Sequence, residues 1–471
     1  MSELSLRMSE TGQFVMRVRA GSDRARRQAA RNSDLNFTGC AMSSISVNPC
    51  LEVATCAAPN ASQRRQAIIA TTIGNGLEWF DFTVYTAFAV IIAKLFFPMD
   101  NPLSSLLLTV GVYGAAFIMR PIGAMVFGIY ADRVGRKQAL SLSVLMMAFG
   151  TALIGLAPSY LSAGMLGPIM LVFARLLQGF SAGGEMGSAS AFLIEYAPAG
   201  RRAFYTSWIQ SSIALNIVLG ALIGALATIL LTHDQLYSWG WRVPFLFGIV
   251  VGPVGFYIRT RIDVSPVAAH MTERSSSPLT EVLQEFRLQT LASCALVALW
   301  TTCTYVYMHY MPTYVVTALH QSQKLAFISV TVGGFVFMVL SPLVGILSDR
   351  WGHRRFLMIS AAAIFLTACP MFAYISRTPT LLSLTVFSVV AGVFSACYSG
   401  PLLAALAELF PSRVLSTGIS VSYNLAVTVF GGFAGFFITL LISMTHSALS
   451  PAFYMMVAAA MSFAGSFAVK S

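Results

Sequence analysis

The sequence predicts an all-α membrane protein with twelve transmembrane helices in two six-helix bundles. Three observations carry this prediction. Of the 471 residues, 56% are hydrophobic and only 10% are charged, whereas a soluble domain carries about a quarter charged residues. The apolar runs are long and do not alternate, which excludes a β-barrel and leaves helices as the way to satisfy the backbone in lipid. The two halves of the chain also repeat short motifs, as transporters built from internal repeats do.

Twelve apolar segments long enough to span a bilayer follow one another from residue 67. They are predicted at 67–97, 103–130, 138–157, 165–194, 204–231, 242–260, 288–317, 325–348, 355–375, 380–408, 414–443 and 450–469. The longest connection, 261–287, is polar and contains Pro266. We therefore expect a first bundle at 67–260, a cytoplasmic linker at 261–287 and a second bundle at 288–471.

Residues 1–66 differ from the rest of the chain, because they are polar, rich in Arg and Ser, and lack a long apolar run. No cleavable secretory signal is visible, and five acidic residues argue against an organellar transit peptide. We expect a disordered cytoplasmic tail. Met42 is an alternative start of the native protein, in which case residues 1–41 would be absent from it.

The net charge of +11 indicates membrane topology rather than nucleic-acid binding, because the basic residues lie mostly in the tail and in predicted loops. Lys and Arg concentrate in the connections that follow even-numbered helices, so both termini are predicted to be cytoplasmic. The seven cysteines have no metal or disulfide spacing. Neither a Walker A sequence nor an H-E-x-x-H motif occurs, so we expect no nucleotide, no metal and no enzymatic activity.

Two motifs recur at equivalent places in the two halves. GIYADRVGRK at 128–137 returns as GILSDRWGHR at 345–354, and IEYAPAGRR at 194–202 resembles AELFPSR at 407–413. The first pair resembles the loop motif of the major facilitator superfamily. The residues that carry this resemblance are Gly128, Asp132, Arg133, Gly135, Arg136 and Lys137, echoed by Gly345, Asp349, Arg350 and Gly352. The resemblance implies the major facilitator fold and a latch between the bundles that stabilises the outward-open state. The alternative is a basic loop that only sets topology.

Further motifs, GNGLEWFDF, MRPIGAMVFGIYADRVGRK, RLLQGFSAGGE, FYTSW and SWGWRVPF, together resemble the metabolite:proton symporter family across 67–469. Its members include citrate, α-ketoglutarate, shikimate and proline/betaine carriers. The resemblance implies proton symport of a small organic acid, most like citrate-type carriers, across a bacterial inner membrane, by a chain we expect to act as a monomer. It implies no cofactor, because the proton gradient supplies the energy. Shikimate, a zwitterionic osmolyte, or a transporter-like sensor are the alternatives.

Ionisable residues inside predicted spans are costly and therefore mark function. The first half contains Glu78, Asp81, Arg120, Arg175 and Glu185. Asp81 is the first candidate for the proton carrier, since its place resembles that of the proton-binding aspartate of superfamily sugar symporters, which faces a helix-4 arginine where Arg175 stands. Glu78 and Glu185 are the second and third candidates. The alternative is that these acids form fixed ion pairs with the arginines.

Arg120 is the first candidate for binding substrate, because a guanidinium offers a planar fork that matches a carboxylate. The alternative is a permanent pair with Glu78 or Asp81. Polar side chains at helical spacing complete the predicted site. Asn75 shares a helix face with Glu78 and Asp81, and Tyr113 shares one with Arg120. The other candidates are Gln178, Gln210, Tyr305 and His309, with Asn216, Tyr398, Tyr423 and Asn424 as weaker ones. Tyr85, Ser188 and Thr313 extend the polar helix faces that carry Asp81, Glu185 and His309.

Overall fold

The computed structural model describes residues 4–8, 14–18, 61–134, 136–183, 185–248 and 278–469. Within these ranges only the backbone is described at 4–8, 14–18, 70, 74, 77, 78, 128, 129, 131–134, 136–141, 185, 188 and 278. The chain divides into two compact units, Met1–Ala57 and Ala58–Ser471.

The first unit contains an antiparallel pair of strands, β1 (Leu4–Met8) and β2 (Phe14–Val18), with Leu4 opposite Val18. These strands were not predicted, although LSLRM alternates apolar and polar residues as a strand does. The predicted disorder of the remaining tail and the predicted domain boundaries stay predictions.

The second unit is helical. Its first half contains α2 (Ala61–Ala87), α3 (Ala89–Phe96), α4 (Pro102–Val134), α5 (Arg136–Leu156), α6 (Tyr160–Ala163), α7 (Leu166–Ser181), α8 (Glu185–Tyr196), α9 (Arg202–Leu230), α10 (His233–Ser238) and η1 (Gly240–Arg242). The predicted sixth span is described only over the helical residues 243–248, and its remainder and most of the predicted linker lie outside the described residues.

The second half follows the same plan. It contains α12 (Pro278–Gln284), α13 (Arg287–Thr304), the π-helix η3 (Tyr305–Tyr310), α14 (Met311–Thr317), α15 (Gln323–Trp351), α16 (His353–Arg377), α17 (Leu381–Leu409), η4 (Ser412–Val414), α18 (Leu415–Val427), the π-helix η5 (Thr428–Gly432), α19 (Ala434–Thr445), α20 (Ser450–Gly465) and η6 (Ser466–Ala468).

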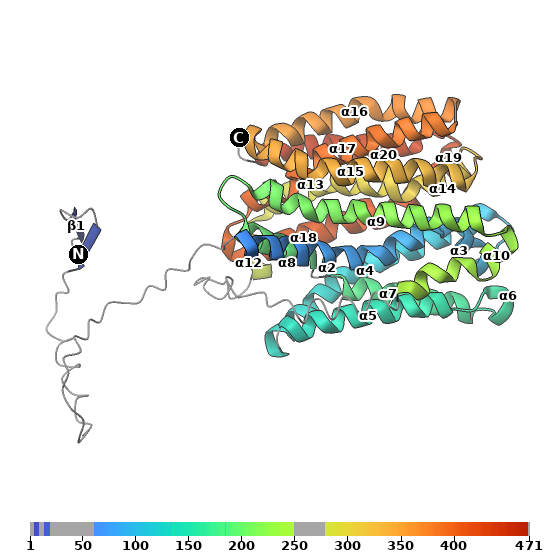
Figure 1. Cartoon of the computed structure of the whole chain (residues 1–471), viewed down its shortest axis with the longest axis horizontal. Coiled ribbons are helices and arrows are strands. Elements are labelled where there is room, and N and C mark those ends of the chain that lie inside the picture. The colour runs from blue at the N-terminus through green and yellow to red at the C-terminus, as the bar shows by residue number, and fades with distance from the viewer. Residues whose placement is uncertain are drawn as a thin grey trace, which may run out of the picture. The chain divides into compact units, whose positions relative to one another are not determined.

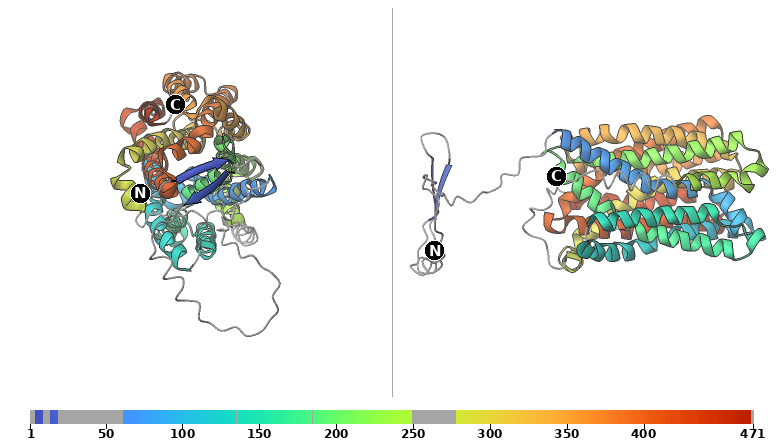
Figure 2. Two further views of the ribbon diagram at one scale, coloured as in Figure 1. Left: turned by 90° about the vertical axis from the view of Figure 1, so that its left-hand side faces the viewer. Right: turned by 60° about the horizontal axis from the view of Figure 1, so that its bottom comes forward.

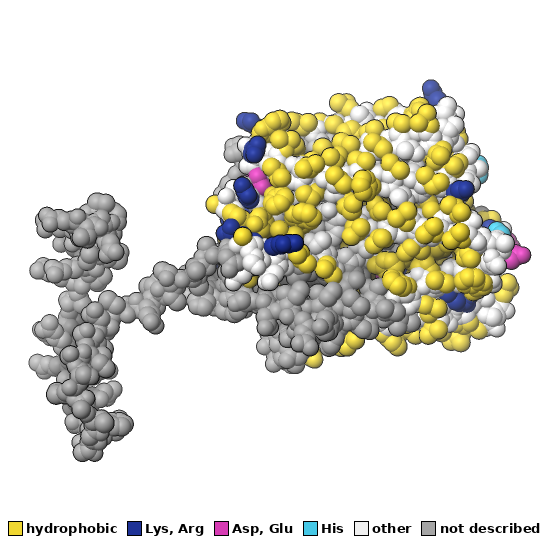
Figure 3. Space-filling view, viewed as in Figure 1, with side chains coloured by type: hydrophobic (Ala, Val, Ile, Leu, Met, Phe, Trp, Pro, Cys, Tyr) yellow, Lys and Arg dark blue, Asp and Glu magenta, His cyan; other side chains and the backbone are white. Residues whose placement is uncertain are grey.

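The helices have the length and surface of membrane spans. Among the described residues, eight helices are long and apolar enough to cross a membrane, and the bent pair of α2 and α3 forms a ninth such segment. Figure 3 shows hydrophobic side chains over the middle of the visible face, with Lys and Arg towards the two ends. Large hydrophobic side chains such as Phe149 and Leu366 are exposed on the surface of the helices, which suits helices that face lipid acyl chains.

The helices run roughly alongside one another (Figure 2), and the two halves pack along their length. Helix α9 of the first half lies beside α15 of the second (Figure 1). We call the end where α15 reaches Trp351 and α9 begins the motif end, and the end where α3 finishes and α15 begins the opposite end.

Glycines let paired helices approach at equivalent places in both halves. A Cβ at Gly179 of α7 would overlap the carbonyl oxygen of Ala116 of α4, and one at Gly392 of α17 would overlap that of Gly333 of α15. Ala116 precedes Gly128 by as many residues as Gly333 precedes Gly345. The structure thus repeats one helix contact in both halves, as pseudo-two-fold symmetry requires.

The first predicted span is broken where the sequence predicts one straight helix. Segments Trp79–Ala87 and Ala89–Phe96 meet at an angle of 70°. No Pro or Gly stands at the break, but the Thr83 and Thr86 hydroxyls bond to carbonyls one turn earlier, which often bends helices. The carbonyl of Ala87 accepts instead from the side chain of Gln323, at 3.1 Å.

We expect Gly179→Ala to lower the melting temperature of the purified protein by several degrees, because the methyl group must displace the α4 backbone and overpacking costs about 1–3 kcal/mol. Gly111→Ala is the matched control. Gly111 lies on α4, and a Cβ there would be 3.7 Å from the Phe436 ring, an ordinary contact. Equal melting temperatures for the two variants would contradict the close contact of α4 and α7.

Candidate functional site

Asp81 lies in the interior of the first half and is 4% exposed. The Thr151 hydroxyl, on α5, donates to Oδ2 of Asp81. Nε2 of Gln178, on α7, donates to Thr151 Oγ1 at 2.8 Å and lies 3.5 Å from Asp81 Oδ2. The backbone at Gly248 closes the remaining side, since a Cβ there would lie 3.2 Å from Oδ1. Neutral donors from neighbouring helices therefore surround the carboxyl group.

The Thr151 hydroxyl has two acceptors for its single hydrogen, the Asp81 carboxylate and the Met147 carbonyl at 3.0 Å. When Asp81 is ionised, the hydroxyl can donate to it. When Asp81 is protonated, its own O–H can donate to Thr151, whose hydrogen then turns to Met147. Both protonation states of the acid can be satisfied by turning one hydroxyl. This suits a group that binds and releases a proton. The sequence reasoning missed Thr151, although it is an isolated polar residue in an apolar helix.

Arg175 lies beside Asp81 and contacts the backbone of Asp81 rather than its carboxylate. Nη2 donates to the Asp81 carbonyl oxygen at 3.4 Å, and the guanidinium lies 3.8 Å from the centre of the Tyr85 ring. No ion pair joins Arg175 to the Asp81 carboxylate in the described part of the chain, where Nε and Nη1 also have no hydrogen-bond partner. The predicted fixed pair between these two side chains is therefore not formed here.

Arg120 lies among aromatic rings and is 2% exposed. Its guanidinium is 4.3 Å from the Phe117 ring, 4.9 Å from Phe82 and 5.7 Å from Trp79, distances at which cation–π attraction applies. The sequence reasoning did not identify these rings, although Trp79 follows Glu78 directly. The side chain of Glu78 lies outside the description, so its pairing with Arg120 stays an open alternative.

The π-helix η3, which follows α13, brings a second set of rings to the same place. Tyr305 lies 5.7 Å from Phe117 and 6.1 Å from Trp79, while His309 stacks 6.3 Å from Trp79 and 5.2 Å from Tyr305. Both belong to the π-helix η3, a rare turn often found at functional sites. We call the set Trp79, Phe82, Tyr113, Phe117, Arg120, Tyr305 and His309 the aromatic cluster. It joins the two halves.

The other predicted substrate residues lie around this cluster or apart from it. Asn75 donates to Ser212 Oγ at 2.8 Å, and Gln210 accepts from Trp300 at 3.0 Å, so each braces one helix against another. Gln178 lies with Asp81 and Thr151 rather than with Arg120. Tyr113 joins the cluster through its ring, 6.3 Å from Tyr305.

The weaker candidates take structural positions. Tyr398 donates to the Leu296 carbonyl at 2.8 Å inside the second half. Tyr423 packs on Trp300, with ring centres 5.3 Å apart. Asn424 donates to the Gly183 carbonyl at 2.9 Å and so ties α18 to the first half.

Several predicted residues lie outside the described side chains, and their roles stay predictions. They are Glu78, Glu185, Ser188, Gly128, Asp132, Arg133, Gly135, Arg136 and Lys137.

The second copy of the loop motif is described and connects the two halves. Asp349, near the end of α15, accepts hydrogen bonds from the backbone N–H groups of Ala203 and Phe204, each at 2.9 Å. These are orphan donors in the first turn of α9, where the helix dipole also favours a negative charge. Gly352, with φ of 93°, ends α15 in a conformation that favours glycine. Asp349 therefore joins the end of α15 to the start of α9, and its role as a latch stays a prediction.

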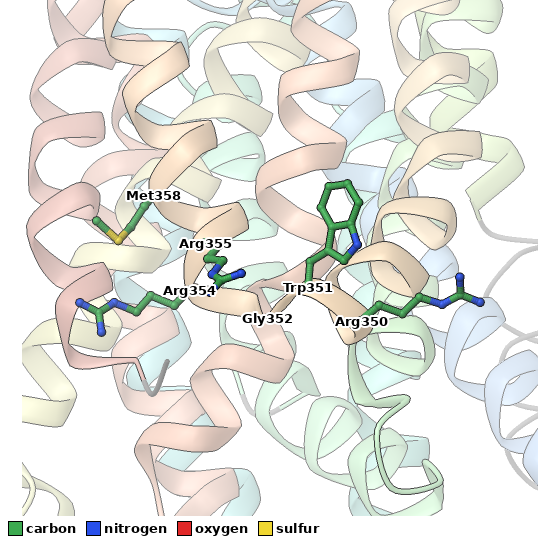
Figure 4. A pocket seen from close by; sticks show the side chains of 6 residues that line it. All are labelled: Arg350, Trp351, Gly352, Arg354, Arg355 and Met358. Atoms are coloured by element: carbon green, nitrogen blue, oxygen red, sulfur yellow. The ribbon is translucent and has the colours of Figure 1, made fainter.

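Arg350 does not take part in this capping. It lines a cavity of about 420 Å³ with Trp351, Gly352, Arg354, Arg355 and Met358 (Figure 4). Arg350 and Arg354 extend to opposite sides of the loop. All lining residues come from the end of α15 and the start of α16, so this cavity is separate from Asp81 and from the aromatic cluster.

The halves also touch towards the opposite end. The Thr86 hydroxyl lies 3.3 Å from Nδ1 of His309, and Gln323 donates to the Ala87 carbonyl at 3.1 Å. Contacts between the halves are therefore formed on both sides of Arg120. Exchange of a bound molecule with either side requires one of these sets to break.

Two repeated helical halves, a buried acid that tolerates two protonation states and an arginine between the halves define a membrane transporter built from internal repeats. The family model of the Major Facilitator Superfamily matches residues 71–435. The chain belongs to this superfamily and is a multi-pass membrane protein. The predicted fold class is confirmed.

Relatives refine the family. The chain is 36% identical to the citrate-proton symporter of Salmonella typhi, over 83% of this chain and 91% of that one. It is also 36% identical to the citrate-proton symporter of Klebsiella pneumoniae (89% and 94%) and 31% identical to the proline/betaine transporter of Escherichia coli K12 (84% and 81%). The predicted resemblance to metabolite:proton symporters is thereby confirmed.

The solved structure of an E. coli xylose transporter in a partially occluded inward-open conformation matches with a TM-score of 0.67 at 16% identity. It covers 86% of this chain and 97% of the xylose transporter. At that identity the match shows the fold alone.

We expect Asp349→Ala to loosen the motif end, because the N–H groups of Ala203 and Phe204 lose their acceptor and a lost helix cap costs about 1–2 kcal/mol. Spin labels at Ala199 and Arg355 would report this as a new population of longer distances. Arg350→Ala is the control and should leave the distances unchanged. An unchanged distance distribution in Asp349→Ala would contradict the latch.

Proposed function

We propose that the protein carries a small organic acid, a di- or tricarboxylate, together with protons by alternating access. The observation that carries this proposal is the placement, within one half, of a buried acid with neutral partners and a buried arginine at the seam between the halves. The names of the citrate-proton symporters to which the chain is similar support it.

Asp81 is the proton carrier in this proposal. The hydrogen bonds to the Asp81 carboxylate come from neutral donors, so its protonation breaks no direct ion pair, a step that costs about 3–5 kcal/mol when the pair is buried. The Thr151 hydroxyl can serve both forms of the acid. Proton uptake from one side and release to the other then follow the exposure of Asp81.

Arg120 is the carboxylate-binding group. Its guanidinium keeps a rigid donor fork, and the faces of Phe82 and Phe117 hold it in the dry region between the halves. Tyr305 and His309 bring the second half to the same place. A substrate bound here would touch both halves, as alternating access about a central site requires.

A second candidate substrate is a zwitterion such as betaine. The aromatic cluster offers faces that attract quaternary ammonium groups, and the proline/betaine transporter is among the similar proteins. Arg120 would then bind the carboxylate of the zwitterion.

The remaining parts of the proposal follow from the loop charges and from the proposed mechanism. The protein would act as a monomer in the bacterial inner membrane with both termini in the cytoplasm. It would not be an enzyme and would use neither a cofactor nor nucleotide, since the proton gradient drives it.

The first experiment is uptake into proteoliposomes of labelled citrate, α-ketoglutarate and betaine under an imposed proton gradient. We expect Asp81→Asn to retain exchange of substrate across the membrane but to lose gradient-driven accumulation, because an amide cannot carry the proton. Asp100→Asn removes an exposed acid and is the control, with normal accumulation expected. Normal accumulation by Asp81→Asn would overturn the coupling role.

We expect Arg120→Lys and Arg120→Gln both to weaken substrate binding by about 10- to 100-fold, because charge-assisted hydrogen bonds contribute about 1.5–3 kcal/mol. Lys keeps the charge but not the fork, so it should recover only part of the affinity. Binding would be measured by titration calorimetry on the purified protein. The exposed Arg377→Gln is the control, and wild-type affinity in Arg120→Gln would remove Arg120 from the site.

A further inference from the structure

We propose that Nε2 of His309 accepts a hydrogen bond from a hydroxyl group of the substrate, so that the site selects hydroxycarboxylates over acids that lack the hydroxyl. This inference rests on the proposed carboxylate transport and names the class of acid and the residue that reads it.

The hydrogen bond on the other side of the ring indicates which nitrogen carries the proton. The Thr86 hydroxyl bonds to the Thr83 carbonyl at 2.9 Å, its shortest contact, and lies 3.3 Å from Nδ1 of His309. A hydroxyl has one hydrogen, so while it donates to Thr83 it can only accept from the imidazole. In this arrangement His309 donates through Nδ1–H, and Nε2 carries the lone pair.

This lone pair is buried and has no hydrogen-bond partner among the described residues. Burying a polar atom without a partner costs about 1–3 kcal/mol, which makes an orphan acceptor a candidate for a ligand contact. No carboxylate of the described residues forms an ion pair with the ring either. Since a buried charge without a partner is costly, the imidazole carries a single N–H.

The position of the ring connects it to the carboxylate-binding group. His309 and Arg120 lie against the same indole, with the His309 ring centre 6.3 Å and the Arg120 guanidinium 5.7 Å from the Trp79 ring. A substrate that contacts both groups would present a carboxylate to Arg120 and a hydrogen-bond donor to Nε2 of His309. His309 belongs to the π-helix η3 of the second half and contacts Thr86 of the first half.

The chemistry of an acceptor excludes several acids. An ionised carboxylate or a keto oxygen would place lone pair against lone pair, and betaine has no N–H or O–H to offer. A hydroxyl on the carbon chain, as in citrate, supplies the donor while the carboxylates remain for Arg120. A site that leaves a buried polar group unpaired rejects the analogue that lacks the matching group.

The test compares citrate with tricarballylate, which differs from citrate only in having hydrogen in place of the hydroxyl. Binding of both acids is measured by calorimetry, and competition for uptake is measured in proteoliposomes. We expect wild-type protein to bind citrate at least tenfold more tightly than tricarballylate. Equal affinity would overturn the inference while leaving carboxylate transport intact. If neither acid binds or is taken up, the proposed function fails and the inference fails with it.

Two variants assign the preference to one nitrogen. His309→Asn keeps a donor where Nδ1–H stands but has no acceptor at the Nε2 position, so citrate affinity should fall to that of tricarballylate while tricarballylate affinity stays unchanged. His309→Gln can place its amide oxygen near the Nε2 position and should keep a preference for citrate. A loss of affinity that is equal for both acids in His309→Asn would mean a structural role for the ring and would overturn the proposal.

Discussion

The first half depends on holding charge-bearing side chains in its interior, three of them among the described residues. Asp81, Arg120 and Arg175 are all buried. Asp81 receives neutral hydrogen bonds, and both arginines lie on aromatic faces. Ring faces and hydroxyls stabilise charge less strongly than an opposite charge does, but they do not commit the acid to one protonation state. The ionised form of Asp81 is therefore stabilised less strongly than it would be in a direct ion pair, and the group can change its protonation state more easily.

The two halves share a scaffold and differ in chemistry. The close contact of Gly179 with Ala116 in the first half has its counterpart in Gly392 with Gly333 in the second. In the first half this contact lies next to Arg120, whose own carbonyl meets Gly183, so the arginine stands on a tightly packed part of α4. The second half instead contributes Tyr305 and His309 from a π-helix. Repetition therefore explains the frame of the molecule, and departures from it explain the site.

Hydropathy and cost of burial predicted the spans and the candidate charges, because both depend on residue type alone. The residues that surround each charged side chain were harder to predict from the sequence. Thr151 belongs to a different helix from Asp81, and Gln178, expected near the substrate, packs with that pair. The 70° bend after Ala87 could not be predicted either, because no Pro or Gly stands at the break. Its freed carbonyl is satisfied by Gln323 from the other half, a tertiary contact that no local pattern reveals.

The hydrogen bonds that join the halves among the described residues are unequal at the two ends. At the opposite end, Thr86 with His309 and Gln323 with Ala87 form neutral bonds, each contributing about 0.5–1.5 kcal/mol. At the motif end, Asp349 is an ionised acceptor for two helix N–H groups, and bonds to charged groups contribute about 1.5–3 kcal/mol. Of these bonds, all between described residues, those of Asp349 at the motif end are the stronger. His309 joins the halves through Nδ1, whereas its Nε2 is buried and has no hydrogen-bond partner among the described residues, so a substrate held at Nε2 would bind a ring that also joins the halves.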